Sequence, residues 1–446
     1  MYIPVPSAYR QKEKNFATLA DQLCAVEELV SPTHRALPPP PPLAAPVHFS
    51  QPNLLTGEER PEKPVANTGS FRRWPAPRCV VPAISSGFVS GERGVVFNAT
   101  HALTNGRWHR RELPPGSAST IIELDMPVVN LVIQWGEEYQ HAVLESLPRL
   151  ALVYDALLGK APVSAQDEDT AVGTCLREAR EDTARLLSTA DWGRAVVLHS
   201  PGQAVRRLLQ EGLGLPASRL LAADPRTTYH APVVIFPTLA HQAKIGVMPP
   251  GAYDPLLARL QSKGAEGAGG VAGGASLLLY LRREPTQARG LSADVEAQLV
   301  AQLQRRLAPG FELHLWDVSS SAVHNFETDA SIFARARVIV GPHGGAFANL
   351  IFTPSGADVV EIIPRASMEM QAPEEPKRDV RPCYHALSGA LGLRYHQFEP
   401  EPVGASRNFF DAKGLRVDVA RLSALLAELG ALTGEYEGSV GERRRR

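Results

Sequence analysis

The sequence has few cysteines, no long apolar run and no excess of one sign of charge. Its 446 residues include only 4 cysteines, and none of these form a Cys-x-x-Cys pair. A zinc site built from such pairs is therefore not expected. The 46 Lys and Arg residues almost balance the 47 Asp and Glu residues. No global basic field exists to recruit nucleic acid, so a nucleic-acid partner is not expected.

The chain also lacks recognisable membrane and export signals. No segment reaches the roughly 18–20 apolar residues that span a bilayer. The first twenty residues lack the basic-then-apolar pattern of a signal peptide. These features predict either a cytosolic protein or one whose targeting segment is missing from this sequence. The triplet Asn98-Ala99-Thr100 makes Asn98 a candidate N-glycosylation site and gives weak support for a secretory compartment.

The length and the low-complexity segments predict two domains with tails. Residues 1–75 are rich in proline, including Pro38–Pro42, and are expected to be disordered. Residues 76–262 are predicted to form the first α/β domain. A glycine-rich linker or insertion follows at 263–275, and a second α/β domain at 276–435.

Strand and helix patterns alternate along both predicted domains, which indicates α/β units with parallel sheets. Strands are expected at 93–97, 119–134, 194–198, 232–236, 276–281, 311–316, 337–340 and 358–363. Helices are expected at 137–158, 292–307, 326–336, from about 346 onward, and at about 417–431.

The most informative stretch is an apolar strand that ends in His343-Gly344-Gly345, before a helix that begins near Ala346. Two glycines allow a close backbone approach and positive φ. The start of the helix offers N–H groups to a phosphate, and His343 could bind a diphosphate oxygen or a sugar hydroxyl. The alternative is a plain strand–turn–helix connection with a structural histidine. Neither GxGxxG nor GxxxxGK[ST] is present.

Three blocks of the chain, in this order, resemble glycosyltransferase family 61. The last block, residues 337–364, is similar to the family's strand, His-Gly-Gly turn, Asn-Leu-x-Phe helix and Val-x-Glu-x-x-Pro strand. The matching positions are His343, Gly344, Gly345, Asn349, Leu350, Phe352, Val359, Glu361 and Pro364. Residues 277–283 with Arg289, and residues 139–150, are similar to two earlier blocks. The resemblance covers about residues 90–400.

This resemblance implies a GT-B fold, in which two Rossmann-like domains face a cleft. The C-terminal domain would bind a UDP-sugar, xylose or N-acetylglucosamine, and the N-terminal domain a glycan or glycoprotein acceptor. It also implies inversion without an essential metal or other cofactor, and work in the Golgi or endoplasmic reticulum lumen. A cytoplasmic location is the alternative. Asp167-Glu168-Asp169 has the spacing of a metal–diphosphate motif, although its polar surroundings favour a solvated acidic loop.

Without a metal, protein groups must stabilise the departing UDP. Arg282, at a strand end, is the first candidate to chelate a phosphate, and its neighbour Arg283 is the alternative. Backbone N–H groups near Gly344, Gly345 and Ala346 would supply further donors. Glu361 is interpreted either as an acceptor for ribose hydroxyls or as the partner of a nearby arginine.

Inversion also needs a general base that accepts the proton of the acceptor hydroxyl. His141 and Glu145 are four residues apart and share one face of a predicted helix. They fit a base and the group that orients it, although a structural hydrogen bond that anchors the helix would use the same spacing.

Two other functions remain open from the sequence. A degenerate member of the same fold would bind a nucleotide sugar without turning it over. A Rossmann oxidoreductase would bind a dinucleotide, but the fingerprint GxGxxG and the following ribose-binding acid are missing. Turnover would separate the transferase from the first alternative, and tight nicotinamide binding would support the second.

Overall fold

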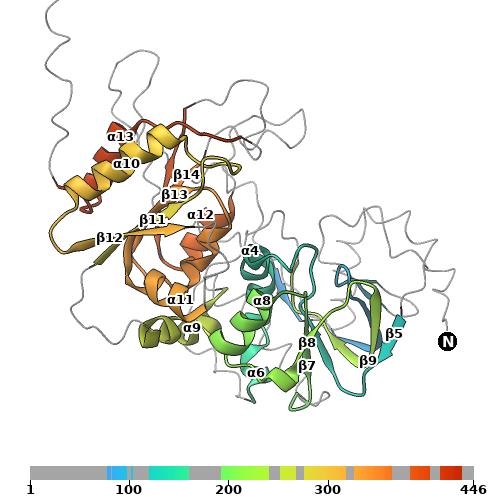
Figure 1. The fold of residues 1–446 in the computed structure, drawn as a ribbon. Helices are drawn as coiled ribbons and strands as arrows, with labels where there is room; N and C mark the ends of the chain where they lie inside the picture. The colour runs from blue at the N-terminus through green and yellow to red at the C-terminus, as the bar shows by residue number, and fades with distance from the viewer. Residues whose placement is uncertain are drawn as a thin grey trace, which may run out of the picture. The chain divides into compact units, whose positions relative to one another are not determined.

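A computed structural model describes ten stretches of the chain, which form two compact units (Figure 1). The described residues are 78–81, 83–97, 102–103, 120–159, 192–240, 252–267, 276–317, 326–363, 382–401 and 412–433. The chain passes from the first unit to the second between Arg259 and Leu260. The predicted disordered segment before residue 76, Asn98 and the acidic triplet 167–169 lie outside the described residues.

The first unit contains ten strands and several short helical segments among its described residues. The strands are β1 (Arg78–Val80), β2 (Ala83–Ser90), β3 (Val96–Phe97), β4 (Ala102–Leu103), β5 (Thr120–Glu123), β6 (Val128–Asn130), β7 (Val196–His199), β8 (Leu220–Ala222), β9 (Thr227–Ile235) and β10 (Thr238–Ala240). The helical segments are α4 (Tyr139–His141), η2 (Ala142–Ser146), α5 (Leu147–Ala151), α6 (Tyr154–Leu157), α8 (Gln203–Arg207), η3 (Leu208–Gly212) and η4 (Ala217–Arg219).

The main sheet of the first unit is mixed, so the prediction of a purely parallel sheet is wrong there. Its order is β4-β3-β2-β9-β6-β7-β8, and β5 also pairs with β9. The pairs among β9, β6, β7 and β8 are parallel, whereas β2 runs antiparallel to both β9 and β3. Ser86, φ 49°, interrupts the alternation of β2 with a left-handed residue, which explains why this strand is not evident from the sequence.

Helix α9 (Asp254–Gly267) carries the chain into the second unit. The predicted glycine-rich linker at 263–275 therefore begins as helix, and its residues from 268 to 275 lie outside the described part. Gly264 is required for packing, because a Cβ there would lie 2.8 Å from the Cβ of Ala334. The limits of the two domains predicted from the sequence otherwise stay predictions.

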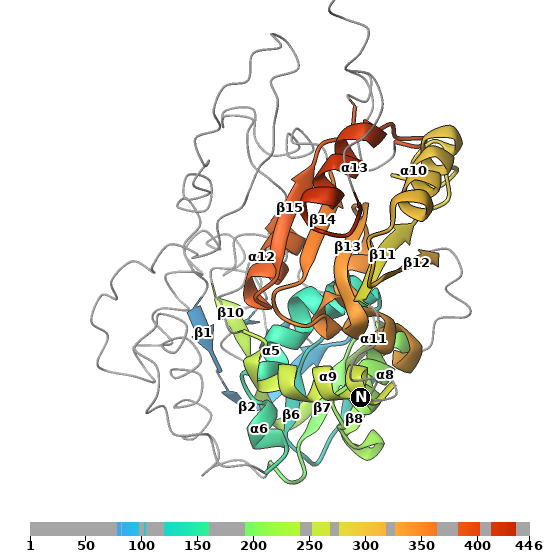
Figure 2. The same ribbon diagram turned by 90° about the vertical axis from the view of Figure 1, so that its left-hand side faces the viewer.

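The second unit has one sheet whose five strands are all parallel, as predicted. The strands are β11 (Ser276–Arg282), β12 (Phe311–Asp317), β13 (Ala336–Pro342), β14 (Asp358–Ile362) and β15 (Arg394–Phe398). The helices are α10 (Ala293–Arg306), α11 (Phe326–Arg335), the 3-10 helix η5 (Gly345–Phe352), α12 (Pro382–Ala390) and α13 (Val419–Glu428). Figure 2 shows the strands in the order β12-β11-β13-β14-β15.

Both faces of this sheet are buried, which explains the almost continuous apolar runs of its strands. Alternate residues such as Leu278, Val340 and Ile362 form one core with apolar residues of α10 and α13. These two helices lie side by side (Figures 1 and 2). Helix α11 packs against β11 and η5, and α12 against β15 and η5. The second unit is therefore a Rossmann-like α/β layer structure.

Each of the two large sheets has a point at which the strand order reverses. In the second unit the chain goes from β11 outward to β12 and then returns to β13 on the other side of β11. In the first unit it goes from β6 outward through β7 and β8, and returns to β9 on the other side of β6. Ligands of open α/β sheets bind outside the carboxyl ends of strands at such points. Ligands are therefore expected at the segments that follow β6 and β9 in the first unit, and β11 and β13 in the second.

Most of the strands and helices predicted for the second unit are confirmed to within two or three residues, whereas two in the first unit are corrected. The strand expected at 119–134 is two short strands, β5 and β6, separated by a bend. The helix expected at 137–158 is divided into α4, the π-helix η2, α5 and α6. Helix α12 and strand β15 were not predicted. Within the described residues, no helix is long and apolar enough to cross a membrane.

Candidate functional site

The strand ends at the reversal in the second unit bring one of the two predicted arginines, Arg283, together with His343. Strand β11 ends at Arg282, and β13, its parallel neighbour, ends one residue before His343. Nη1 of Arg283 donates a hydrogen bond to the carbonyl oxygen of His343 over 3.2 Å. Residues 60 positions apart thus meet at the carboxyl edge of the sheet. We call Arg283, His343 and Gly344 the strand-end cluster.

The two neighbouring arginines differ in what they contact. Nε of Arg282 lies 3.2 Å from Oε1 of Glu296, a buried carboxylate on α10 to which the Tyr280 hydroxyl also donates. The hydrogen bond to Glu296 raises the pKa of Arg282. The charge of Arg282 is therefore matched within the protein.

Arg283 is half-buried and forms no ion pair with an acid within the described residues. Burial lowers the pKa of its guanidinium, which shows that the protein only partly replaces the lost hydration. Its buried Nε has no hydrogen-bond partner in the described part of the chain. A desolvated guanidinium of this kind favours an anionic ligand. Of the two candidates from the sequence, Arg283 is thus the one whose environment suits an anion.

The glycines after His343 provide space rather than positive φ. Gly344 has φ 173°, an extended conformation open to any residue, and neither Gly344 nor Gly345 lies in the left-handed region that favours glycine. The expectation of positive φ is therefore wrong. A Cβ on Gly344 would lie 2.6 Å from Nη1 of Arg283, so a side chain would displace the guanidinium. Helix η5 begins at Gly345, and the N–H groups of its first turn, including that of Ala346, point away from the helix body.

A buried series of hydrogen bonds from the neighbouring strands fixes the ring of His343. Its Nδ1 contacts Oε1 of Glu361 on β14, and the Tyr395 hydroxyl on β15 donates to Oε2 of Glu361 over 2.5 Å. Glu361 is 1% exposed, so both carboxylate oxygens are used inside the protein. No arginine of the described residues contacts Glu361, whose two carboxylate oxygens bind His343 and Tyr395. Its role as an acceptor for ribose hydroxyls stays a prediction. Glu361 orients the His343 ring, with Nε2 on the opposite side.

The ring of His385 on α12 packs beside this series of hydrogen bonds, and its stabilising effect depends on pH. It packs edge-on against Tyr395, with ring centroids 5.2 Å apart. Burial lowers the pKa of His385 to about 4, from 6.5. The neutral ring is thus favoured in the folded state, and its contribution is fully present above about pH 6.5 and is lost as the pH falls towards 4.

We expect acidification from about pH 7.5 to about pH 4 to cost the wild type about 3 kcal/mol of unfolding free energy through His385. His385→Phe keeps an aromatic ring against Tyr395 and removes the titrating group. Denaturant unfolding at both pH values should show a smaller acid-induced loss for the variant. An equal loss in both proteins would contradict this role of His385.

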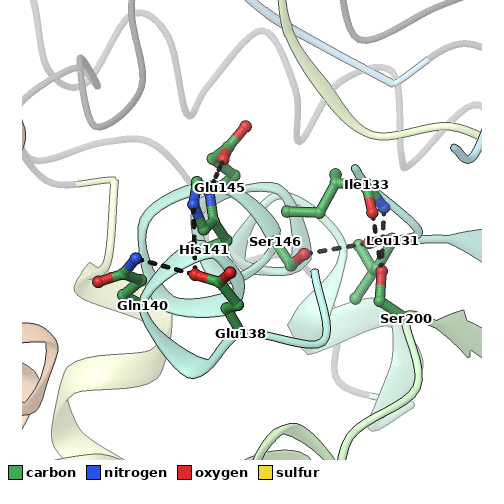
Figure 3. A network of polar contacts seen from close by, with 8 residues as sticks. All are labelled: Leu131, Ile133, Glu138, Gln140, His141, Glu145, Ser146 and Ser200. Carbon is green, nitrogen blue, oxygen red and sulfur yellow. Dashed lines mark hydrogen bonds and ion pairs between the residues drawn. The ribbon is translucent and has the colours of Figure 1, made fainter. Parts of the chain in front are cut away.

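The reversal in the first unit places His141 and Glu145 directly after β6. Nδ1 of His141 lies 2.7 Å from Oε1 of Glu145, as the helical spacing predicts (Figure 3). Nε2 of His141 lies on the side of Glu138, 3.9 Å from its Oε2. The His141 and Glu145 side chains are 13% and 17% exposed. A ligand can therefore reach a histidine whose other nitrogen is held by a carboxylate, which is the arrangement of a general base and its orienting group.

The helix that carries this pair is distorted at the pair itself. Residues 142–146 are π-helical, and such turns are frequent at functional sites. The Tyr253 hydroxyl donates to the Val143 carbonyl over 2.7 Å and so satisfies a backbone group within the distortion. Ser146 Oγ donates to the Leu131 carbonyl, which fastens the helix to the end of β6 (Figure 3).

Arg149 is a charged residue of this helix whose role the sequence did not reveal. It is 1% exposed, and its Nε and Nη1 have no hydrogen-bond partner within the described residues. Burial lowers its pKa to about 10, and the charge of Glu145 acts in the opposite direction. Arg149 therefore places a buried positive charge near Glu145, the residue that contacts Nδ1 of His141. The spacing of four residues from Glu145 was a signal available in the sequence.

Other members of the site have weaker sequence signals. Tyr395 reaches Glu361 only because β15 pairs with β14, a contact between distant segments. Trp135 lies beside His141 in the turn before α4, and nothing in the sequence distinguishes it from other aromatic residues. The described residues include no group of three or more His, Cys, Asp or Glu side chains arranged to hold a metal ion. The acidic triplet 167–169 lies outside the described stretches.

The sequence model of the family Glycosyltransferase 61 matches residues 139–360, a stretch that begins at the helix of His141 and ends at β14. It includes His141, Glu145, Arg283 and His343. No curated protein matches the chain.

Proposed function

Because the chain belongs to glycosyltransferase family 61 and is a glycosyltransferase, we propose that it moves a sugar from a UDP-sugar to a hydroxyl of a glycan or glycoprotein. Xylose and N-acetylglucosamine are the sugars proposed for the donor. The observation that carries the donor assignment is the strand-end cluster, where an arginine without an acidic partner in the described residues lies at the carboxyl edge of a parallel sheet. A nucleotide diphosphate is the anionic ligand that such a position suits.

In this proposal the second unit binds the donor. The guanidinium of Arg283 contacts the diphosphate, and the N–H groups at the start of η5 add partial positive charge. Nε2 of His343, held in orientation by Glu361, faces the same ligand. These groups stabilise the negative charge that develops on UDP as the bond between the sugar and the phosphate breaks. No resident metal is part of the proposal.

The first unit binds the acceptor in this proposal. His141 accepts the proton of the attacking hydroxyl at Nε2, while Glu145 holds Nδ1 and stabilises the imidazolium that forms. The acceptor oxygen bonds to the anomeric carbon as UDP leaves from the opposite face. One displacement inverts the anomeric configuration, and the proton passes from the hydroxyl to His141. The GT-B arrangement of the two units and the lumenal location stay predictions.

A panel of donors tests this proposal. Purified protein is incubated with UDP-xylose, UDP-N-acetylglucosamine, UDP-glucose and UDP-galactose, each with and without EDTA, and UDP release is measured. We expect release from UDP-xylose or UDP-N-acetylglucosamine that EDTA does not change. Loss of release in EDTA would show that a metal is required. UDP binding without release from any donor, with acceptors supplied, would favour a degenerate binding protein, and no UDP binding would contradict the donor site.

A further inference from the structure

Trp135 is an exposed aromatic residue in an unusual backbone conformation. Among the large hydrophobic side chains of the described residues, only Ile122 and Trp135 are exposed, at 40% and 39%. Trp135 has φ 58°, in the left-handed region that bulky residues avoid. Such a conformation costs about 1–3 kcal/mol and persists where the surrounding structure enforces it. A large ring is thus presented to solvent at an energetic cost.

The turn that carries Trp135 is fixed from both sides. The Glu138 N–H donates to the Trp135 carbonyl over 3.0 Å, and the Gly136 N–H donates to the Ile133 carbonyl. Ser200 Oγ, at the end of β7, accepts from the Ile133 N–H and donates to the Ile133 carbonyl (Figure 3). Only glycine fits at position 136, because a Cβ would lie 2.1 Å from Ser200 Oγ. The ends of β6 and β7 therefore fix the backbone that carries the indole.

The indole ring lies beside the proposed base. The ring centroids of Trp135 and His141 are 5.7 Å apart and their planes are inclined by 50°. A hydroxyl that gives its proton to His141 must come within about 3 Å of a nitrogen of the imidazole. The sugar that carries this hydroxyl then lies over the residues next to His141. Among them, Trp135 offers an exposed, flat and apolar surface. The C–H face of a pyranose is complementary to such a ring.

The polar residues that follow Trp135 in the chain, residues 137–140, are acidic or neutral. Glu137 and Glu138 are exposed beside it, and the Gln140 amide donates to Oε2 of Glu138 over 3.0 Å (Figure 3). Glu145 lies on the other side of His141. Carboxylates and amides accept and donate hydrogen bonds to sugar hydroxyls. The two exposed carboxylates, Glu137 and Glu138, repel a uronic acid or a sialic acid, since like charges at short range are unfavourable.

We propose that Trp135 is the stacking surface for the acceptor sugar, and that this acceptor is a neutral pyranose of a glycan. The proposal rests on the proposed function, because it uses His141 as the base. It assigns Glu138 and Gln140 as hydrogen-bonding groups at the rim of the acceptor site. Trp135 is a specificity-determining residue in this scheme, and the proton transfer is carried out by His141.

Binding without a donor tests the acceptor site apart from catalysis. An array of neutral, uronic-acid-containing and sialylated oligosaccharides is probed with the full chain and with Trp135→Ala, Trp135→Asn and Trp135→Tyr. Asparagine tolerates the left-handed conformation. A loss of glycan binding in Trp135→Asn would therefore reflect the missing indole and not backbone strain. We expect binding to neutral glycans to fall about tenfold in the alanine and asparagine variants, and to persist in the tyrosine variant.

Ile122→Ala is the matched control, since it removes a hydrophobic side chain of equal exposure from the same unit. It is expected to bind as the wild type does. UDP binding, measured by calorimetry, should be unchanged in all of these variants. If the donor panel shows no UDP release while neutral glycans still bind through Trp135, the acceptor site stands and the transfer reaction does not. Wild-type binding by Trp135→Asn, preference for acidic glycans, or no neutral ligand at all would overturn the proposal.

Discussion

Replacing Arg283 with glutamine is expected to lower the rate of sugar transfer about 10²–10³-fold, the usual loss when one group that stabilises developing charge is removed. Arg283 is the arginine at the carboxyl edge of the parallel sheet whose Nε has no hydrogen-bond partner in the described residues. Steady-state kinetics with the best donor of the panel gives the rate, and calorimetry gives the affinity for UDP. Both should fall, because the guanidinium contacts the leaving group in the ground state and in the transition state.

Arg282→Gln is the matched control for this variant. It changes the adjacent residue in the same way, but Arg282 is bound to Glu296 on α10. We expect a loss of stability, since a buried carboxylate loses its ion pair, with a much smaller loss of UDP affinity. Thermal unfolding of both variants separates the two effects. If Arg282→Gln loses UDP binding and Arg283→Gln does not, the assignment of the phosphate ligand is reversed.

Replacing His141 with glutamine is expected to lower the rate of transfer about 10²–10⁴-fold, the range found for removal of a general base. The affinity for UDP should stay unchanged, because the proposed donor contacts lie in the second unit. Glutamine can still form a hydrogen bond but cannot accept and hold the proton. Transfer is measured with saturating donor and a neutral acceptor, and UDP binding by calorimetry.

Two further variants show whether the effect at His141 is chemical. Glu145→Gln keeps a hydrogen-bonding group beside Nδ1 and removes the negative charge, so we expect a smaller loss of rate than for His141→Gln. Glu138→Gln alters an exposed carboxylate at the rim of the proposed acceptor site, 3.9 Å from Nε2, and is expected to raise the KM for the acceptor more than it lowers kcat. A His141→Gln protein with wild-type turnover would show that the His141–Glu145 pair only anchors the helix.

Local contacts between nearby residues were predictable from the sequence. The His141–Glu145 pair follows from helical spacing, and the structure confirms the contact at 2.7 Å. The position of His343 at the end of a buried strand follows from the apolar run before it. The choice between Arg282 and Arg283 did not follow, because successive strand residues point to opposite faces and the partner of each depends on the neighbouring helix. Arg282 donates to Glu296 on α10, whereas Arg283 donates to the carbonyl oxygen of His343.

The sequence by itself determined the family, the α/β class and the residues of the two functional segments, since these depend on local patterns of spacing and hydrophobicity. Only the tertiary structure decided what those residues contact. Strand pairing brought Glu361 into contact with His343, and Tyr395 into contact with Glu361. The ends of β6 and β7 fixed the turn in which Trp135 has its left-handed conformation. The physical reason is that such contacts join residues far apart in the chain, and their geometry is set by the packing of whole sheets and helices rather than by the residues beside them.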